Sequence, residues 1–374
     1  MSRSFWYIVL LIGILVIQLQ AQENKPVLKD TLDGKLDLSN YVINMHGFIP
    51  TPFIITEPAV GSFGAGLALT FISPMKNFRF PDITGVAGMY TANKSWAGAL
   101  FRQGTLPKRE LRYTTALAYG DINMSFYRNL ANKGEQEYEF KLKPFFLLLD
   151  VNRNLYQNRI FAGLRYMFTN MQVNYAPGDA LLPDSIFSKA ESDQNLGTLG
   201  LYGEYDSRNS MFTPDKGIRF KGTYTLARSF LGSDIDIERL DGFLHIFVNP
   251  RQWLVSGFRI EGQMISDGAP FYYLPFLLMR GLPIMKYQGE ETILFETEQR
   301  FDLNLRWSLV GFIGTGRTYN DSKYLQDDNW YTAGGAGFRY LVARLFKLRM
   351  GVDVALGPDN QFAYYIIFGH NWMR

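Results

Sequence analysis

Several charged residues in the second half of the chain have the types and spacing for ion pairing. Arg280 lies in the run Met279-Arg280-Gly281-Leu282, inside the long connection from Asp267 to Glu290. A later segment carries Glu296, Glu298 and Arg300 at alternate positions. Successive side chains of a strand point to opposite faces, so these three share one face. A guanidinium removed from water needs carboxylate or carbonyl acceptors, and its planar fork suits a carboxylate. The pattern predicts either a buried ion pair or ordinary charges that line a pore.

A second charged motif lies at a strand end. The run Tyr205-Asp206-Ser207-Arg208-Asn209 is followed by Pro214 and Gly217. An aspartate at such a position accepts backbone N–H groups, and a glycine allows a positive φ angle. We therefore expect this motif to form a structured turn.

The residues needed for catalysis or metal binding are sparse. The chain has three histidines and no cysteine. His245 shares a strand face with Phe243 and Phe247, which predicts a histidine at a lipid edge or an interface rather than a general base. No Gly-x-Ser-x-Gly elbow, His-Glu-x-x-His pair or His/Cys cluster occurs. We expect no enzymatic activity, no cofactor and no metal; the alternative is a serine and histidine brought together from distant strands.

The elements that must position these residues read as strands. Alternation is clear around residue 260, where apolar and polar side chains take opposite faces: Phe258, Ile260 and Met264 against Arg259, Glu261 and Gln263. After Ile17 no run of 18 or more apolar residues occurs, so a membrane role would require a closed barrel. This predicts an all-β fold, a transmembrane antiparallel β-barrel, with a soluble β-sandwich as the alternative. The net charge of +3 over 374 residues predicts no nucleic-acid partner.

The predicted organisation has three parts. Residues 1–21 resemble a cleaved signal peptide, with Arg3 before an apolar run and Ala21 at the cleavage site. Residues 22–60 would be a short periplasmic segment, and residues 61–374 the barrel. Fifteen candidate strands can be marked, the first near Ser62 to Phe71. Single-chain bacterial barrels have even strand numbers, so we expect about 16 strands.

Both charged motifs resemble those of the bacterial surface antigen family, the BamA/TamA superfamily. The segment Tyr205 to Gly217 is similar to the family's strand-end motif. Met279-Arg280-Gly281-Leu282 resembles its Val-Arg-Gly-Phe/Tyr motif, on an extracellular loop whose tip folds into the barrel lumen. The position of the family's partner for the loop arginine corresponds to Glu298. The resemblance therefore implies a barrel with an inward-folded loop, with Glu296, Glu298 and Arg300 as its candidate lumenal partners.

The sequence departs from the family pattern in two places. Gly314 stands where the family's Phe-x-Asp-x-Gly strand has a second acid, which leaves Glu298 or Glu296 as acceptors for Arg280. Residues 22–60 are also too few to form a periplasmic POTRA domain, so we expect a barrel that lacks these domains.

The resemblance implies assembly or translocation of outer-membrane proteins in the Gram-negative outer membrane. Its partners would be outer-membrane lipids, and unfolded outer-membrane proteins or other assembly factors. The physical basis would be a weak seam between the first strand and the last, near Phe362 to Trp372, because exposed strand edges can pair with an incoming strand. The alternative is a passive pore, or a structural barrel, plugged by the loop that carries Arg280. The client and the oligomeric state stay open.

Overall fold

The structure is a computed structural model that describes residues 28–40, 47–61, 63–73, 82–106, 110–130, 134–175, 193–320, 329–358 and 361–372. The predicted signal peptide, residues 1–21, lies outside these ranges. No helix among the described residues is long and apolar enough to cross a membrane.

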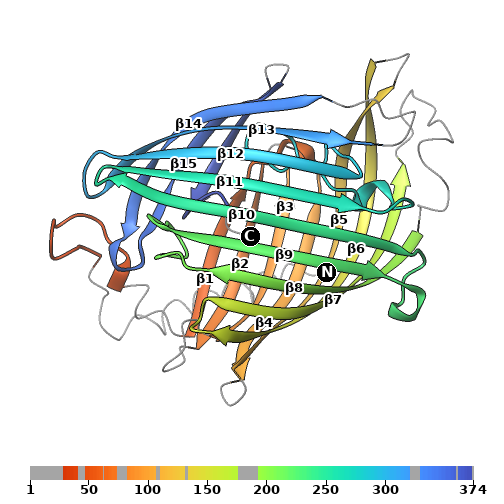
Figure 1. Cartoon of the computed structure of the whole chain (residues 1–374), viewed down its shortest axis with the longest axis horizontal. Helices are drawn as coiled ribbons and strands as arrows, with labels where there is room; N and C mark the ends of the chain where they lie inside the picture. The colour runs from red at the N-terminus through yellow and green to blue at the C-terminus, as the bar shows by residue number, and fades with distance from the viewer. Residues whose placement is uncertain are drawn as a thin grey trace, which may run out of the picture.

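Sixteen strands form one antiparallel sheet in which each strand pairs with its neighbours in sequence. Figure 1 shows them wound around a single lumen, as predicted for a barrel. The strands are β1 (Gly47–Ile55), β2 (Gly64–Ser73), β3 (Asp82–Thr91), β4 (Trp96–Leu106), β5 (Leu111–Leu130), β6 (Gly134–Tyr156), β7 (Ile160–Tyr175), β8 (Asp193–Asp206), β9 (Gly217–Ala227), β10 (Ile237–Arg251), β11 (Leu254–Ile265), β12 (Glu291–Asp302), β13 (Trp307–Tyr319), β14 (Trp330–Ala343), β15 (Leu348–Leu356) and β16 (Phe362–Phe368). Short 3-10 turns occur at η1 (Pro58–Val60), η4 (Ser229–Leu231), η5 (Phe271–Tyr273) and η6 (Arg344–Phe346).

The distribution of polar residues is inverted relative to a soluble protein. On β11, Phe258, Ile260 and Met264 are exposed, while Arg259 and Glu261 between them are buried. A broad exposed apolar surface is stable against lipid rather than water, and a polar interior is typical of membrane-spanning barrels. The alternation predicted from sequence thus has its apolar face outward.

The sheet begins earlier than the sequence predicted. β1 spans Gly47–Ile55 and pairs with β2, so the barrel does not start at residue 61 and its first strand is not Ser62 to Phe71. β1 contains Pro50 and Pro52, and proline cannot donate to a ladder. Both are tolerated because β1 is an edge strand, and N–H groups two residues apart point to the same side. We infer that the two prolines face the free edge.

The two ends of the sheet meet at a seam. β1 pairs with β2 and β16 pairs with β15, and no described residue forms a ladder between β1 and β16. β16 is only seven residues long. It ends at Phe368 because Gly369, with φ 79°, turns the chain away from the sheet.

A segment that precedes the barrel packs against the end where the connections are short. Arg306, in the turn between β12 and β13, donates to Asp30 (2.6 Å), Asp33 (2.7 Å) and Asp37 (2.7 Å). Arg344 of η6 also donates to Asp30, at 2.5 Å. Residues 28–40 are therefore clamped to this end of the barrel by two arginines.

Acid should release this clamp. The hydrogen bond from Arg344 holds the pKa of Asp30 at about 2, below its ordinary value of 3.8, and Arg306 lowers the pKa of Asp33. Because both pKa values are lower when docked, the stabilisation is complete above about pH 4 and is lost as pH falls toward 2. A spin label on Lys35→Cys should be immobile at pH 7 and become mobile only across that interval. In Arg306→Gln, where Arg344 still pairs with Asp30, the label should be more mobile than in wild type at pH 7. Unchanged mobility there would disprove the role of Arg306.

Candidate functional site

The connection between β11 and β12 folds into the lumen. Its apolar side chains Leu277, Met279 and Leu282 are buried against Leu294 and Ala333 of the barrel wall. The tip is a tight turn in which the Leu282 N–H donates to the Met279 carbonyl at 3.1 Å. Gly281 has φ 92°, and a Cβ there would lie 3.0 Å from the Ala333 side chain. The predicted inward-folded loop is present, and the glycine allows both the turn and the close approach.

Arg280 is enclosed by three carboxylates. Its Nη2 lies 3.0 Å from Glu296 Oε1 and 2.7 Å from Glu298 Oε2. Its Nη1 donates to Asp353 Oδ2 at 2.5 Å. The guanidinium carbon lies 3.5 Å from the ring centroid of Phe312, a cation–π contact. Both acids that sequence analysis named as alternatives therefore contact Arg280, together with a third that it did not name.

Two further arginines complete a buried ion cluster, defined here as Arg259, Arg280, Arg339, Glu261, Glu296, Glu298 and Asp353. Arg339 pairs with Asp353 through its two terminal nitrogens, Nη1 and Nη2. Arg259 pairs with Glu261 and, at 3.1 Å, with Glu296, and it donates to the Leu278 carbonyl at 3.0 Å. Charges buried this deeply are stable only when paired and hydrogen-bonded. Several strands of the wall and the loop are thereby tied together.

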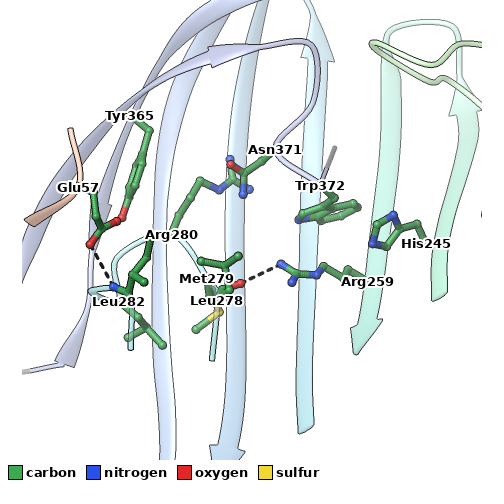
Figure 2. A pocket seen from close by; sticks show the side chains of 11 residues that line it. Glu57, His245, Arg259, Leu278, Met279, Arg280, Leu282, Tyr365, Asn371 and Trp372 are labelled. Atoms are coloured by element: carbon green, nitrogen blue, oxygen red, sulfur yellow. Dashed lines mark hydrogen bonds between the residues drawn. The ribbon is translucent and has the colours of Figure 1, made fainter. Parts of the chain in front are cut away.

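The C-terminal residues enter the same cluster. The Trp372 indole N–H donates to Glu296 Oε2 at 2.8 Å, and Trp372 is buried. Its ring lies beside His245 (Figure 2), and the two ring centroids are 5.5 Å apart. A cavity of about 230 Å³ remains between the loop, the tail and Glu57, whose carboxylate accepts the Ile284 N–H at 3.0 Å. The tail is therefore a second lumenal element, and it uses the carboxylate that also contacts Arg280.

The strand-end motif forms the expected turn. Asp206 Oδ1 accepts the backbone N–H of Arg208 at 3.0 Å, and the carboxylate also pairs with the Arg208 guanidinium. Gly217 has φ 120°, and a Cβ there would lie 2.6 Å from Arg208 Cα. Pro214 is fully buried. Arg208 Nη1 also lies 3.1 Å from His370 Nε2, so the motif contacts the C-terminal tail as well as its own turn.

Two predictions from sequence need correction. Arg300 faces the lumen but does not reach the loop: it pairs with Asp302 (2.9 Å) and with Asp215 (2.6 Å) of the turn between β8 and β9. His245 is not at a lipid edge. It is buried and points inward, because the apolar face of β10 around it packs on Trp372 rather than on lipid.

Sequence analysis missed the acid that replaces the family's missing one. Gly314 leaves the space that Met279 fills: a Cβ there would lie 2.3 Å from the Met279 sulfur. Asp353 on β15 supplies the charge instead. The available signal was Asp353 itself, the one acidic residue of β15, on the same inward parity as Arg349.

The sheet and its filled lumen define the class: a sixteen-stranded antiparallel barrel with an extracellular-type loop and a C-terminal tail held inside. Among solved structures, the chain is similar to BamA from Haemophilus ducreyi lacking POTRA domains 1–3, at 11% identity and a TM-score of 0.60, over 86% of this chain and 69% of that one. It is also similar to CdiB from Escherichia coli (11%, 0.61) and from Acinetobacter baumannii (9%, 0.56). The match covers 86% of this chain in each case but under two thirds of either CdiB chain, 62% and 59%.

No protein-family description and no curated protein matches the chain in sequence. At identities this low the structural matches establish the fold, and they confirm the predicted barrel.

Removing the Arg280 guanidinium should destabilise the barrel. Arg280→Ala would leave buried carboxylates without their shared cation, at a cost of about 3–5 kcal/mol in the free energy of unfolding. We expect a lower heat resistance of the folded band on semi-native gels. Arg251→Ala, at an exposed arginine, is the control and should keep the wild-type value. Equal heat resistance in both variants would contradict a structural role for the cluster.

Full stability of the barrel should require glycine at position 314 but not at position 311 of the same strand. Gly314→Ala would push Met279, and with it the loop, away from the barrel wall, because its methyl group also meets Phe295 O at 3.0 Å. A destabilisation of about 1–3 kcal/mol is expected for such overpacking. At Gly311 a Cβ would have nothing within 4 Å, so Gly311→Ala should not change the stability. The urea concentration at the unfolding midpoint measures both variants. Identical midpoints for the two variants would show that the loop tolerates displacement.

Proposed function

We propose that this chain is an outer-membrane barrel that acts in the assembly or translocation of other outer-membrane proteins through the seam between β1 and β16. The observation that carries the proposal is that neither edge has a ladder partner among the described strands. An unpaired edge presents N–H and C=O groups that can pair with an incoming strand. Unfolded outer-membrane proteins are the partners with the matching chemistry.

Both edges are poor partners for each other. Pro50 and Pro52 remove two donors from the free edge of β1, while their carbonyl oxygens remain as acceptors. β16 contributes only seven residues, and the tail that could extend it lies in the lumen, held by Glu296. A seam closed by few hydrogen bonds needs little energy to open.

The proposed location is supported by the apolar exterior and by the fold shared with BamA and CdiB. Export would require the predicted signal peptide. In this placement the short connections, with the clamped residues 28–40, face the periplasm, and the loop carrying Arg280 enters from outside.

A second candidate is a structural barrel or a closed pore. It is favoured by the filling of the lumen from both ends by the Arg280 loop and the C-terminal tail.

Cross-linking the seam separates the two candidates. The chain has no cysteine, so Thr51→Cys with Ala363→Cys places one thiol on the lumenal face of each edge strand for a bismaleimide. In cells depleted of the natural protein we expect a broad loss of folded outer-membrane proteins by quantitative proteomics. The double variant should restore them, and should fail to do so once cross-linked, because the seam cannot open.

The control pair is Ala68→Cys with Ala87→Cys, which are ladder partners on β2 and β3. It should restore assembly with or without the cross-linker. An unchanged outer-membrane inventory after depletion would reject the assembly role and favour the plugged barrel.

A further inference from the structure

An arginine lies on the outer face of the barrel, where the neighbouring side chains are apolar. Arg102 on β4 is exposed and has the same outward parity as Leu100 and Leu106, which are 55% and 48% exposed. Lipid-facing strand positions disfavour arginine, increasingly with depth. Such a charge is stable in a membrane when an anion or water reaches it.

The guanidinium is oriented by two hydrogen bonds and makes no direct ion pair with a described residue, and Asp82 acts on it only through space. Its Nε donates to the Tyr113 hydroxyl at 2.9 Å and its Nη1 to the Thr84 hydroxyl at 2.8 Å. Both partners are neutral. Asp82, at the start of β3, instead accepts the Thr105 N–H at 2.9 Å. Among the described residues no carboxylate lies within ion-pairing distance of Arg102 and no acceptor is found for Nη2, so one edge of the fork is available to an anion.

An apolar groove adjoins this charge. A surface cavity of about 580 Å³ opens over β2 to β5, next to Arg102. Its walls are mainly side chains of outward-facing apolar residues: Leu69, Phe71, Val86, Leu100 and Leu117. A guanidinium beside an apolar groove is complementary to a ligand that has an anionic group and a hydrocarbon chain.

The position along the strand places Arg102 in one leaflet. Trp96 begins β4, and its ring lies 5.8 Å from that of Tyr119, which forms part of an aromatic girdle at the end with long loops. Arg102 follows about six residues later, roughly 20 Å along the strand and about 15 Å along the axis of a tilted barrel. The apolar band of such barrels is about 25 Å tall. Arg102 therefore lies in the half nearer the short connections, and its long side chain can extend toward the phosphates of that leaflet.

We propose that the outer face of β3 to β5 binds one glycerophospholipid of the periplasmic leaflet, with its phosphate on Arg102 and one acyl chain in the groove. Arginine binds phosphate oxygens through two parallel N–H groups, and Thr84 and Tyr113 hold the fork in place for this. This inference rests on the membrane placement proposed above but not on the assembly role.

Native mass spectrometry of the full barrel tests the proposal. The barrel is released from dodecyl maltoside micelles containing 1-palmitoyl-2-oleoyl-phosphatidylglycerol, and the lipid retained is counted at increasing collision energy. We expect wild type to retain one phosphatidylglycerol, and Arg102→Gln to bind it about tenfold more weakly. Arg153→Gln is the matched control, because Arg153 is exposed near the same end of the barrel but does not line the groove. It should bind like wild type.

Two other probes identify the source of binding. Diacylglycerol with the same acyl chains lacks the phosphate, and sn-glycerol 3-phosphate lacks the chains; both should be retained at least tenfold less than phosphatidylglycerol. Equal retention of diacylglycerol would reduce the site to an apolar groove, and equal retention of glycerol phosphate would make it a site for soluble phosphate. Either result, or equal binding by Arg102→Gln and Arg153→Gln, overturns the proposal.

Folding is checked by heat modifiability on semi-native gels. If Arg102→Gln does not fold, the double variant Thr84→Val with Tyr113→Phe is used instead, because it keeps the charge of Arg102 but removes its two hydrogen-bond acceptors. The retention of the three probes by the wild-type barrel then still tests the lipid site. A barrel that fails to insert into phosphatidylethanolamine–phosphatidylglycerol vesicles would refute the membrane placement. One that inserts but retains no lipid would refute only the lipid site.

Discussion

The Glu296 carboxylate is the group on which the interior of this barrel depends. Its side chain is fully buried, and it contacts Arg259 of the wall, Arg280 of the loop and Trp372 of the tail. A buried carboxylate is tolerated only when its oxygens are paired, and removal of one partner leaves an uncompensated charge. The wall, the loop and the tail are therefore held in place together, and displacement of any one weakens the positioning of the other two.

This dependence follows from an inverted architecture. Because most apolar side chains of the strands face outward, the lumen holds small apolar clusters instead of the single hydrophobic core that fixes loops in soluble proteins. Ion pairs and a few apolar contacts perform that task here. Arg280 has its cation–π contact with Phe312, and Leu277, Met279 and Leu282 pack on the wall. The position of the loop is closely fixed, because a side chain at either Gly281 or Gly314 would displace it.

The seam and the lumen are connected through the C-terminal tail. Gly369 directs the chain inward, so residues that could lengthen β16 instead reach Arg208 and Glu296. The strand-end motif and the loop motif, remote in sequence, thus contact one short segment. The same inward turn shortens the edge that faces β1, where Pro50 and Pro52 already reduce the number of donors. The turn at Gly369 therefore both directs the tail into the lumen and shortens the edge strand at the seam.

The sequence by itself determined the barrel, because period-two alternation and the lack of long apolar runs leave few other folds for a membrane chain. It also determined the turn chemistry of Asp206 and Gly217 and the inward face of Glu296 and Glu298. Only the tertiary structure decided which distant segments contact one another. Asp353, Trp372 and His370 are separated from their partners by many residues, and no local spacing encodes those contacts. β1 was missed for the same reason: whether prolines are tolerated depends on which strands lie beside them, and only the tertiary structure shows that β1 is an edge strand.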